Sequence, residues 1–119
     1  MISSSKEIDF DRLRTLLSSD TLVKKYIEKF IDHTPIHFMQ LCNAIKEYNL
    51  EGIKVAAHSL RTQFEYLNHI RAIEMLRYFE DVVDKESIKG DRVELRLSEF
   101  EHIFSQTLTE MKKRNKDMS

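Results

Sequence analysis

The chain has 119 residues, 33% of them charged and 41% hydrophobic, with two glycines, one proline and a single cysteine. This length suits one domain, and so few helix breakers among so many Leu, Ile, Glu and Lys residues favour helices. The net charge of −1 gives no global electrostatic case for nucleic-acid binding. The polar N-terminus lacks the apolar region of a signal peptide, no apolar run approaches the roughly 20 residues of a membrane span, and Cys42 can form no internal disulfide. We therefore expect a cytoplasmic protein that enters no membrane.

Apolar residues at helical spacing mark the first two helices. Residues 9–17 form a short amphipathic segment, and the polar side chains at 18–20 offer N-cap oxygens for the next helix. That helix carries a stripe from Leu22 to Ile31, meets Pro35, and resumes its stripe from Phe38 to Tyr48. Because proline removes a backbone donor, we expect either a kink or a stop with a new helix beginning at Pro35.

Two further segments follow with turn residues between them. Asn49 can end the second helix or cap the third, which runs from about Leu50 to Leu67. Asn68 lies where the chain must turn, and asparagine tolerates the left-handed conformation. The fourth segment runs from His69 to about Lys85.

The last helix follows a predicted turn at Lys89-Gly90. Asp91 with Glu94 resembles a capping box, and apolar spacing continues from Val93 to Met111. Short connections between these segments predict an all-α fold, an antiparallel four-helix bundle with a short extra N-terminal helix. We expect one domain over residues 1–119, with a polar N-terminal lead, a core over about 8–112 and a basic C-terminal tail.

His58 lies off the apolar stripe of the third segment. On a helical wheel the apolar residues from Ile53 to Leu67 fall together, and His58 lies roughly 150° from their centre. We therefore expect His58 to face away from the core of its own helix. A surface histidine without a role is the plain alternative.

Two cations lie one turn from His58 on the same face, Lys54 before it and Arg61 after it. They disfavour a protonated imidazole, which keeps a ring nitrogen free as a nucleophile, and they favour an attached phosphoryl group. Arg61 can also give charge-assisted hydrogen bonds to phosphate oxygens. The face suits a histidine that accepts and passes on a phosphoryl group, although Lys54, Arg61 and Glu65 also suit an ordinary solvated helix face.

The stretch from Asn49 to Thr62 resembles the histidine-containing phosphotransfer (HPt) domain, whose signature is Ala-His-x-Leu-Lys-Gly followed later by Leu-Gly. An upstream segment, Phe30 to Pro35, resembles the phenylalanine-to-proline stretch of the family's preceding helix. The likeness covers about residues 8 to 110. Ala57, His58, Leu60 and Leu67 match the signature, while Arg61 replaces its lysine and Asn68 replaces its second glycine.

The resemblance implies a phosphorelay intermediate and not an enzyme. His58 would accept a phosphoryl group from the aspartyl phosphate of a response-regulator receiver domain and pass it to another receiver. The implied partners are receiver domains and a sensor or hybrid histidine kinase; the chain would be a monomer without a cofactor, and the receiver would hold Mg²⁺. Lys54 and Arg61 would support the phosphoryl group. Docking would use Thr62, Glu65 and Ile36.

Two alternatives stay within signalling. Thr62 stands where the family has glycine or another small residue, so the chain is alternatively a degenerate module that docks receivers without carrying phosphate. Residues 58–62 also resemble the histidine-kinase motif His-Glu-Leu-Arg-Thr-Pro, but Ser59 replaces its acid and Gln63 its proline. A kinase dimerisation fragment is the second alternative.

Other chemistry has less support. His33 and His37 could face one ion if the helix continues through Pro35, and Glu99 with His102 forms a single Glu-x-x-His pair. Neither pattern supplies a full ligand set, so we expect no metal site. Cys42 lies on an apolar stripe and is expected in the core.

Overall fold

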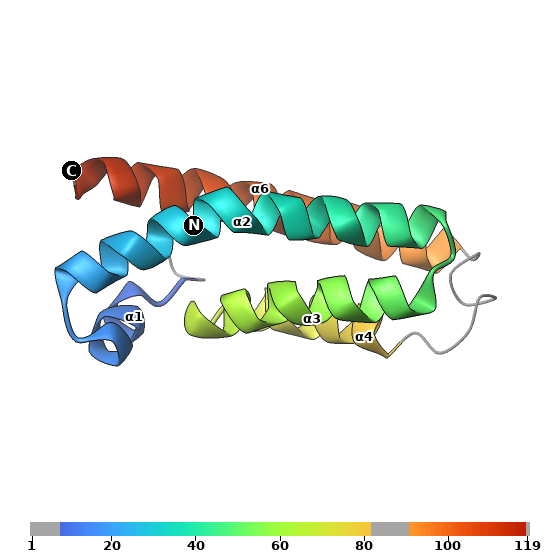
Figure 1. The fold of residues 1–119 in the computed structure, drawn as a ribbon, viewed down its shortest axis with the longest axis horizontal. Helices are drawn as coiled ribbons and strands as arrows, with labels where there is room; N and C mark the ends of the chain where they lie inside the picture. The colour runs from blue at the N-terminus through green and yellow to red at the C-terminus, as the bar shows by residue number, and fades with distance from the viewer. Residues whose placement is uncertain (1–7, 82–90, 119) are drawn as a thin grey trace, which may run out of the picture.

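Figure 1 shows a computed structural model of the chain, which describes residues 8–81 and 91–118. Every regular element in these ranges is an α-helix, which confirms the predicted all-helical class. None of these helices is both long and apolar enough to span a membrane. The helices are α1 (Phe10–Leu17), α2 (Asp20–Lys46), α3 (Leu50–Tyr66), α4 (Ile70–Glu80) and α6 (Asp91–Asp117).

Polar side chains cap the first three helices, and those of α2 and α3 lie where the sequence predicts. Asp9, Ser19 and Asn49 are the N-caps of α1, α2 and α3, and each side-chain oxygen accepts a hydrogen bond from the backbone N–H three residues on. Each such cap contributes about 1 kcal/mol. After α3, Asn68 adopts the expected left-handed conformation with φ of 51°. The caps and this turn fix where α3 begins and ends.

The start and end of α4 differ from the prediction. His69 precedes α4 as its N-cap, and its ring Nδ1 accepts a hydrogen bond of 3.2 Å from the backbone N–H of Ala72. The helix ends at Glu80, earlier than the predicted Lys85. The predicted turn at Lys89-Gly90 lies outside the described residues, as does the side chain of the predicted cap at residue 91.

The helix α2 continues through Pro35, so the alternative in which a new helix begins there is wrong. Pro35 has no N–H to offer the carbonyl of Ile31, and Figure 1 shows α2 changing direction along its length. The buried Thr34 hydroxyl donates a hydrogen bond of 2.5 Å to the carbonyl of Phe30, a contact that often accompanies a bend.

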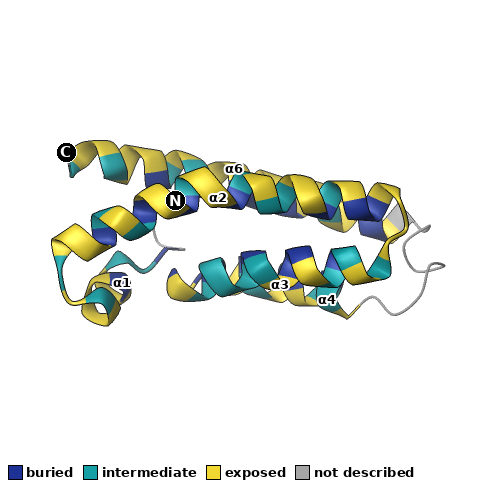
Figure 2. Ribbon diagram, viewed as in Figure 1, coloured by how far each residue is buried: buried dark blue, intermediate teal, exposed yellow. Residues whose placement is uncertain are grey.

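The four longer helices pack side by side around a shared apolar interior. The helix α2 contacts α3 and α6, α4 also contacts α3 and α6, and α1 packs on α2. Figure 1 shows the chain reversing direction at each step from α2 to α3, α4 and α6. Figure 2 shows the buried residues along the sides on which the helices face one another.

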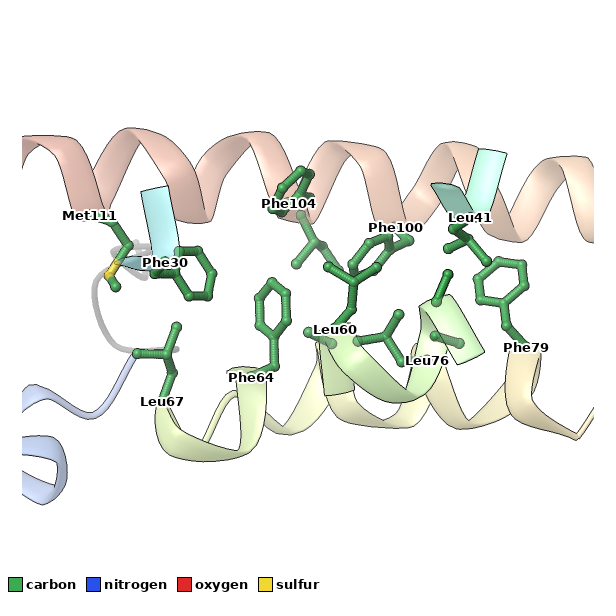
Figure 3. Close-up of a cluster of buried hydrophobic side chains, with 14 of the residues drawn as sticks. Phe30, Leu41, Leu60, Phe64, Leu67, Leu76, Phe79, Phe100, Phe104 and Met111 are labelled. Atoms are coloured by element: carbon green, nitrogen blue, oxygen red, sulfur yellow. The ribbon is translucent and has the colours of Figure 1, made fainter. Parts of the chain in front are cut away.

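Aromatic rings hold the inner face of α3 in place. Phe64 is fully buried and lies edge-to-face with Phe30 of α2 at 5.5 Å and with Phe100 of α6 at 5.8 Å between centroids. Such pairs contribute about 0.5–1.5 kcal/mol each beyond their buried area. Figure 3 shows these side chains pointing into the space between the helices. Because this face of α3 is fixed inward, its opposite face is presented outward.

Candidate functional site

His58 lies on the outward face of α3, as the helical wheel predicts. Its side chain is 63% exposed, although it sits near the middle of a helix whose other face is almost fully buried. The buried residues of α3 are Ile53, Ala56, Ala57, Leu60 and Phe64. The imidazole is therefore carried on a rigid element and is accessible to a partner.

Two charged side chains approach the same ring nitrogen of His58. Nη2 of Arg61 lies 3.1 Å from Nδ1, within hydrogen-bond distance. Oε1 of Glu80, at the last residue of α4, lies 3.8 Å from Nδ1. Nδ1 therefore faces the protein, and it is Nε2 that is left for a partner.

Arg61 bridges two carboxylates from different helices. Its Nε and Nη2 donate to the two oxygens of Glu80 at 2.5 and 3.2 Å, and its Nη1 donates to Glu65 at 2.7 Å. The side chains of Arg61 and Glu80 are only 18% and 20% exposed. The hydrogen bonds that the Arg61 guanidinium donates to Glu80 raise its pKa above the usual value, so Arg61 stays a cation throughout the ordinary pH range.

The other predicted phosphate-supporting residue, Lys54, is half-buried one turn before His58 on α3. No carboxylate within residues 8–81 or 91–118 forms an ion pair with it. Its ammonium is thus not committed to a neighbour there, whereas the donors of Arg61 are shared between Glu80 and Glu65. The two predicted cations are therefore not equivalent.

The three predicted docking residues lie in different settings. The Thr62 hydroxyl donates a hydrogen bond of 3.1 Å to the carbonyl of His58, so its polar end is turned back along the helix. Glu65 is the second partner of Arg61. Ile36 lies on α2 and is 55% exposed.

Two exposed apolar residues that the sequence analysis did not single out accompany Ile36. Met39 lies three residues after it on α2, and Val55 lies three residues before His58 on α3. Between these two helices is a groove of about 430 Å³. It is lined by Gln40, Asn43, Ala44, Glu47, Asn49, Gly52, Val55 and Ala56. The groove thus reaches the turn of α3 that precedes His58.

Metal chemistry gains no support from the geometry. The helix α2 is continuous between His33 and His37, yet His37 lies 3.3 Å from the amide oxygen of Gln40. Glu99 pairs with Arg96 at 3.4 Å. Across the part of the chain that the structure describes, no three His, Cys, Asp or Glu side chains come together as a metal site.

Glu80 is the site residue that sequence reasoning missed. It is the last residue of an ordinary amphipathic helix, and no motif marks it. Its contact with Arg61 depends on how α3 and α4 are aligned along each other, and α3 and α4 do pack together. The available signal was only an acidic pair, Glu80-Asp81, near the end of the segment after His58.

Comparisons with protein-family models, with curated proteins and with solved structures give no match for this chain. The likeness to the HPt domain therefore stays a prediction from the sequence. What bears on function is the group around His58 on α3: a solvent-facing imidazole, Arg61, and the carboxylates of Glu80 and Glu65.

Proposed function

We propose that this chain is a histidine-containing phosphotransfer domain that relays a phosphoryl group through His58. The observation that supports this most is an exposed imidazole at the middle of a well-packed helix, with a guanidinium 3.1 Å from its inner nitrogen. In this proposal α2, α3, α4 and α6 form an antiparallel four-helix bundle, to which α1 is the short addition.

The chemistry uses Nε2 as the nucleophile, because Nδ1 lies against Arg61 and Glu80. The Nε2 lone pair attacks the phosphorus of an aspartyl phosphate on a receiver domain. A nitrogen–phosphorus bond forms while the bond from phosphorus to the aspartate oxygen breaks, and the aspartate leaves as a carboxylate. The reacting form of the ring carries its proton on Nδ1, so it gains a positive charge beside Glu80 when the nitrogen–phosphorus bond forms. The reverse reaction on a second receiver completes the relay.

The contributions of the two partners differ. A receiver supplies Mg²⁺, which neutralises charge that develops on the phosphoryl oxygens. This chain supplies the nucleophile and its position, and it needs no cofactor. Lys54 is the cation on this chain best placed to meet the phosphoryl group first, since Arg61 is initially bound to two carboxylates. The chain is in this sense a carrier and not an enzyme.

Docking of the receiver follows from the surface beside His58. Val55 lines the groove between α2 and α3, and Ile36 and Met39 are further exposed apolar residues on α2. Thr62 lies on the other side of the histidine along α3. We propose receiver domains and a sensor or hybrid histidine kinase as the partners, with a cytoplasmic monomer as the acting form.

A docking module without phosphoryl transfer is the second candidate, and Thr62 is the observation that favours it. Its side chain stands where HPt domains have a small residue, one turn from His58. The extra bulk would keep a receiver from approaching Nε2 closely while leaving its apolar contacts intact. Thr62→Gly separates this candidate from the first, because it should restore transfer if bulk alone prevents it.

The testing experiment is phosphoryl transfer from a panel of phosphorylated receiver domains. The expected result is an acid-labile, alkali-stable label on the wild-type protein and on His102→Gln, an exposed histidine on α6, but not on His58→Gln. No label from any receiver, with binding of at least one, would favour the docking module. A stable dimer in sedimentation equilibrium would instead favour a kinase dimerisation fragment.

A further inference from the structure

The contact between Arg61 and His58 determines where the imidazole proton lies. A guanidinium has donors only, so the 3.1 Å contact from Nη2 makes Nδ1 an acceptor. A neutral imidazole carries one N–H, which must then be on Nε2. In this arrangement the nitrogen that faces a partner bears a proton, and its lone pair is not available for attack.

Three hydrogen bonds hold Arg61 in this position. Nε and Nη2 bind both oxygens of Glu80, Nη1 binds Glu65, and the side chain is largely buried among them. The planar fork of a guanidinium can serve two carboxylates and a ring nitrogen together, which the single ammonium of a lysine cannot do with the same fixed geometry. The replacement of the usual HPt lysine by Arg61 therefore has a structural consequence at His58.

Glu80 offers the alternative partner for the same ring nitrogen. Its Oε1 lies 3.8 Å from Nδ1. This distance is too long for a hydrogen bond, but a small movement of either side chain would allow one. If Arg61 withdraws, Glu80 can accept a hydrogen bond from a protonated Nδ1. The proton then leaves Nε2 and another reaches Nδ1 through solvent, so the ring's proton count is unchanged and the Nε2 lone pair becomes free.

We propose that Arg61 and Glu80 form a tautomer lock on His58. Arg61 donates to Nδ1 and so holds the ring proton on Nε2. When Arg61 is released, Nδ1 carries the proton and donates to Glu80, and the Nε2 lone pair becomes available. Both residues act through His58 and are positioning residues. The tautomer is a property of the free chain, whereas its consequence for relay rests on the proposed function.

An anion that competes with Nδ1 for the Arg61 guanidinium would release this lock. An incoming phosphoryl group offers the guanidinium three oxygens and more negative charge than one carboxylate. As it draws Arg61 away from Nδ1, it also leaves Glu80 able to accept a hydrogen bond from Nδ1 once the ring proton has moved there. The nucleophile would thus be freed by the approach of its own substrate, and an unphosphorylated receiver would leave it locked.

The test reads the tautomer directly from nitrogen chemical shifts of ¹⁵N-histidine protein, at a pH of about 8.5, where imidazoles are ordinarily neutral. The wild type is expected to show the Nε2–H form of His58. Arg61→Met should raise the ratio of Nδ1–H to Nε2–H by about tenfold, the factor expected for a charge-assisted hydrogen bond. Arg61→Lys should raise it less. Arg77→Met, an exposed arginine on α4, is the matched control.

A double variant, Arg61→Met with Glu80→Ala, should bring the ratio back toward Nε2–H because the alternative acceptor is gone. The lock is overturned if the wild type shows Nδ1–H, or if neither Arg61 variant moves the ratio. Labelling by phosphoramidate, a small phosphoryl donor, is measured in parallel. If the Arg61 variants change the ratio of Nδ1–H to Nε2–H but His58 is never labelled, the lock stands and the relay is rejected. If His58 is labelled but the ratio is the same in all variants, the relay stands and the lock is rejected.

Discussion

The ion pair between Arg61 and Glu80 should stabilise the fold much more than the pair between Arg61 and Glu65. The first joins α3 to α4 through two hydrogen bonds between side chains that are about four-fifths buried. The second lies on one helix, and Glu65 is 43% exposed. Double-mutant cycles with Arg61→Met, Glu80→Gln and Glu65→Gln measure both couplings against one shared residue.

The magnitudes follow from burial and geometry. Unit charges about 4 Å apart near a protein surface attract by about 4 kcal/mol, and desolvation with side-chain ordering removes part of this. We expect a coupling of about 2 kcal/mol for Arg61 with Glu80, above the ~0.2–1 kcal/mol of exposed pairs. For Arg61 with Glu65 we expect about 0.3 kcal/mol, since the acid follows the base in the less favourable i, i+4 order.

Urea unfolding followed by circular dichroism provides the free energies, first at low salt and then at about 1 M salt, where the Debye length is near 3 Å. The coupling to Glu65 should nearly vanish at high salt, and most of the coupling to Glu80 should remain. Equal couplings at low salt, or a larger one for Glu65, would refute the reasoning that the α3–α4 bridge is the principal partner of Arg61.

Three further predictions concern residues away from His58. Burial raises the pKa of Tyr26, so the folded state holds the phenolic proton more tightly than the unfolded chain; stability should be complete below about pH 10 and fall as pH rises above it. Tyr26→Phe should lose this alkaline dependence. At pH 7 it should also lower the free energy of unfolding by about 1 kcal/mol, because the 2.8 Å hydrogen bond to the carbonyl of Gln63 is lost. Urea unfolding of both proteins at pH 7 and above about pH 10 checks this. His69→Ala should cost about 2–3 kcal/mol in thermal unfolding and His69→Asn about 1 kcal/mol less, since asparagine can still accept from Ala72 N–H; equal losses would contradict the cap. Burial also raises the pKa of the Cys42 thiol, so iodoacetamide should alkylate it more slowly at pH 8 than a free peptide thiol, and an equal rate would show that the thiol is not shielded.

The outward position of His58 could be predicted because it depends on one helix alone. The 3.6-residue period of α3 and its cap at Asn49 are local features, and local features determine which face of a packed helix is apolar. Pro35 is different, because proline is compatible with a kink and with a helix start. Packing of α2 against both α3 and α6 accompanies the continuous form, and the sequence carries no local signal for that packing.

Contacts between helices account for what sequence reasoning missed. Arg61 was expected to face a phosphoryl group, yet its nearest partners are Glu80 on α4 and Glu65 one turn on. A slip of α4 by one turn along α3 would leave every apolar period intact and remove the contact with Glu80. His69 was missed for another reason: histidine is outside the usual set of N-cap residues, and only its ring orientation shows that Nδ1 accepts from Ala72.

The charge balance at His58 is the point at which the sequence and the structure lead to different chemistry. The sequence places two cations beside the ring, which suggests a site that attracts and keeps phosphate. In the structure one guanidinium and two carboxylates, Arg61 with Glu80 and Glu65, sum to a charge of −1 on the α4 side of the ring. A phosphoryl dianion on Nε2 would then be repelled there unless Lys54 or a partner's Mg²⁺ offsets the charge. In the proposed relay, this charge balance would favour passing the phosphoryl group on while docked over storing it on the free chain.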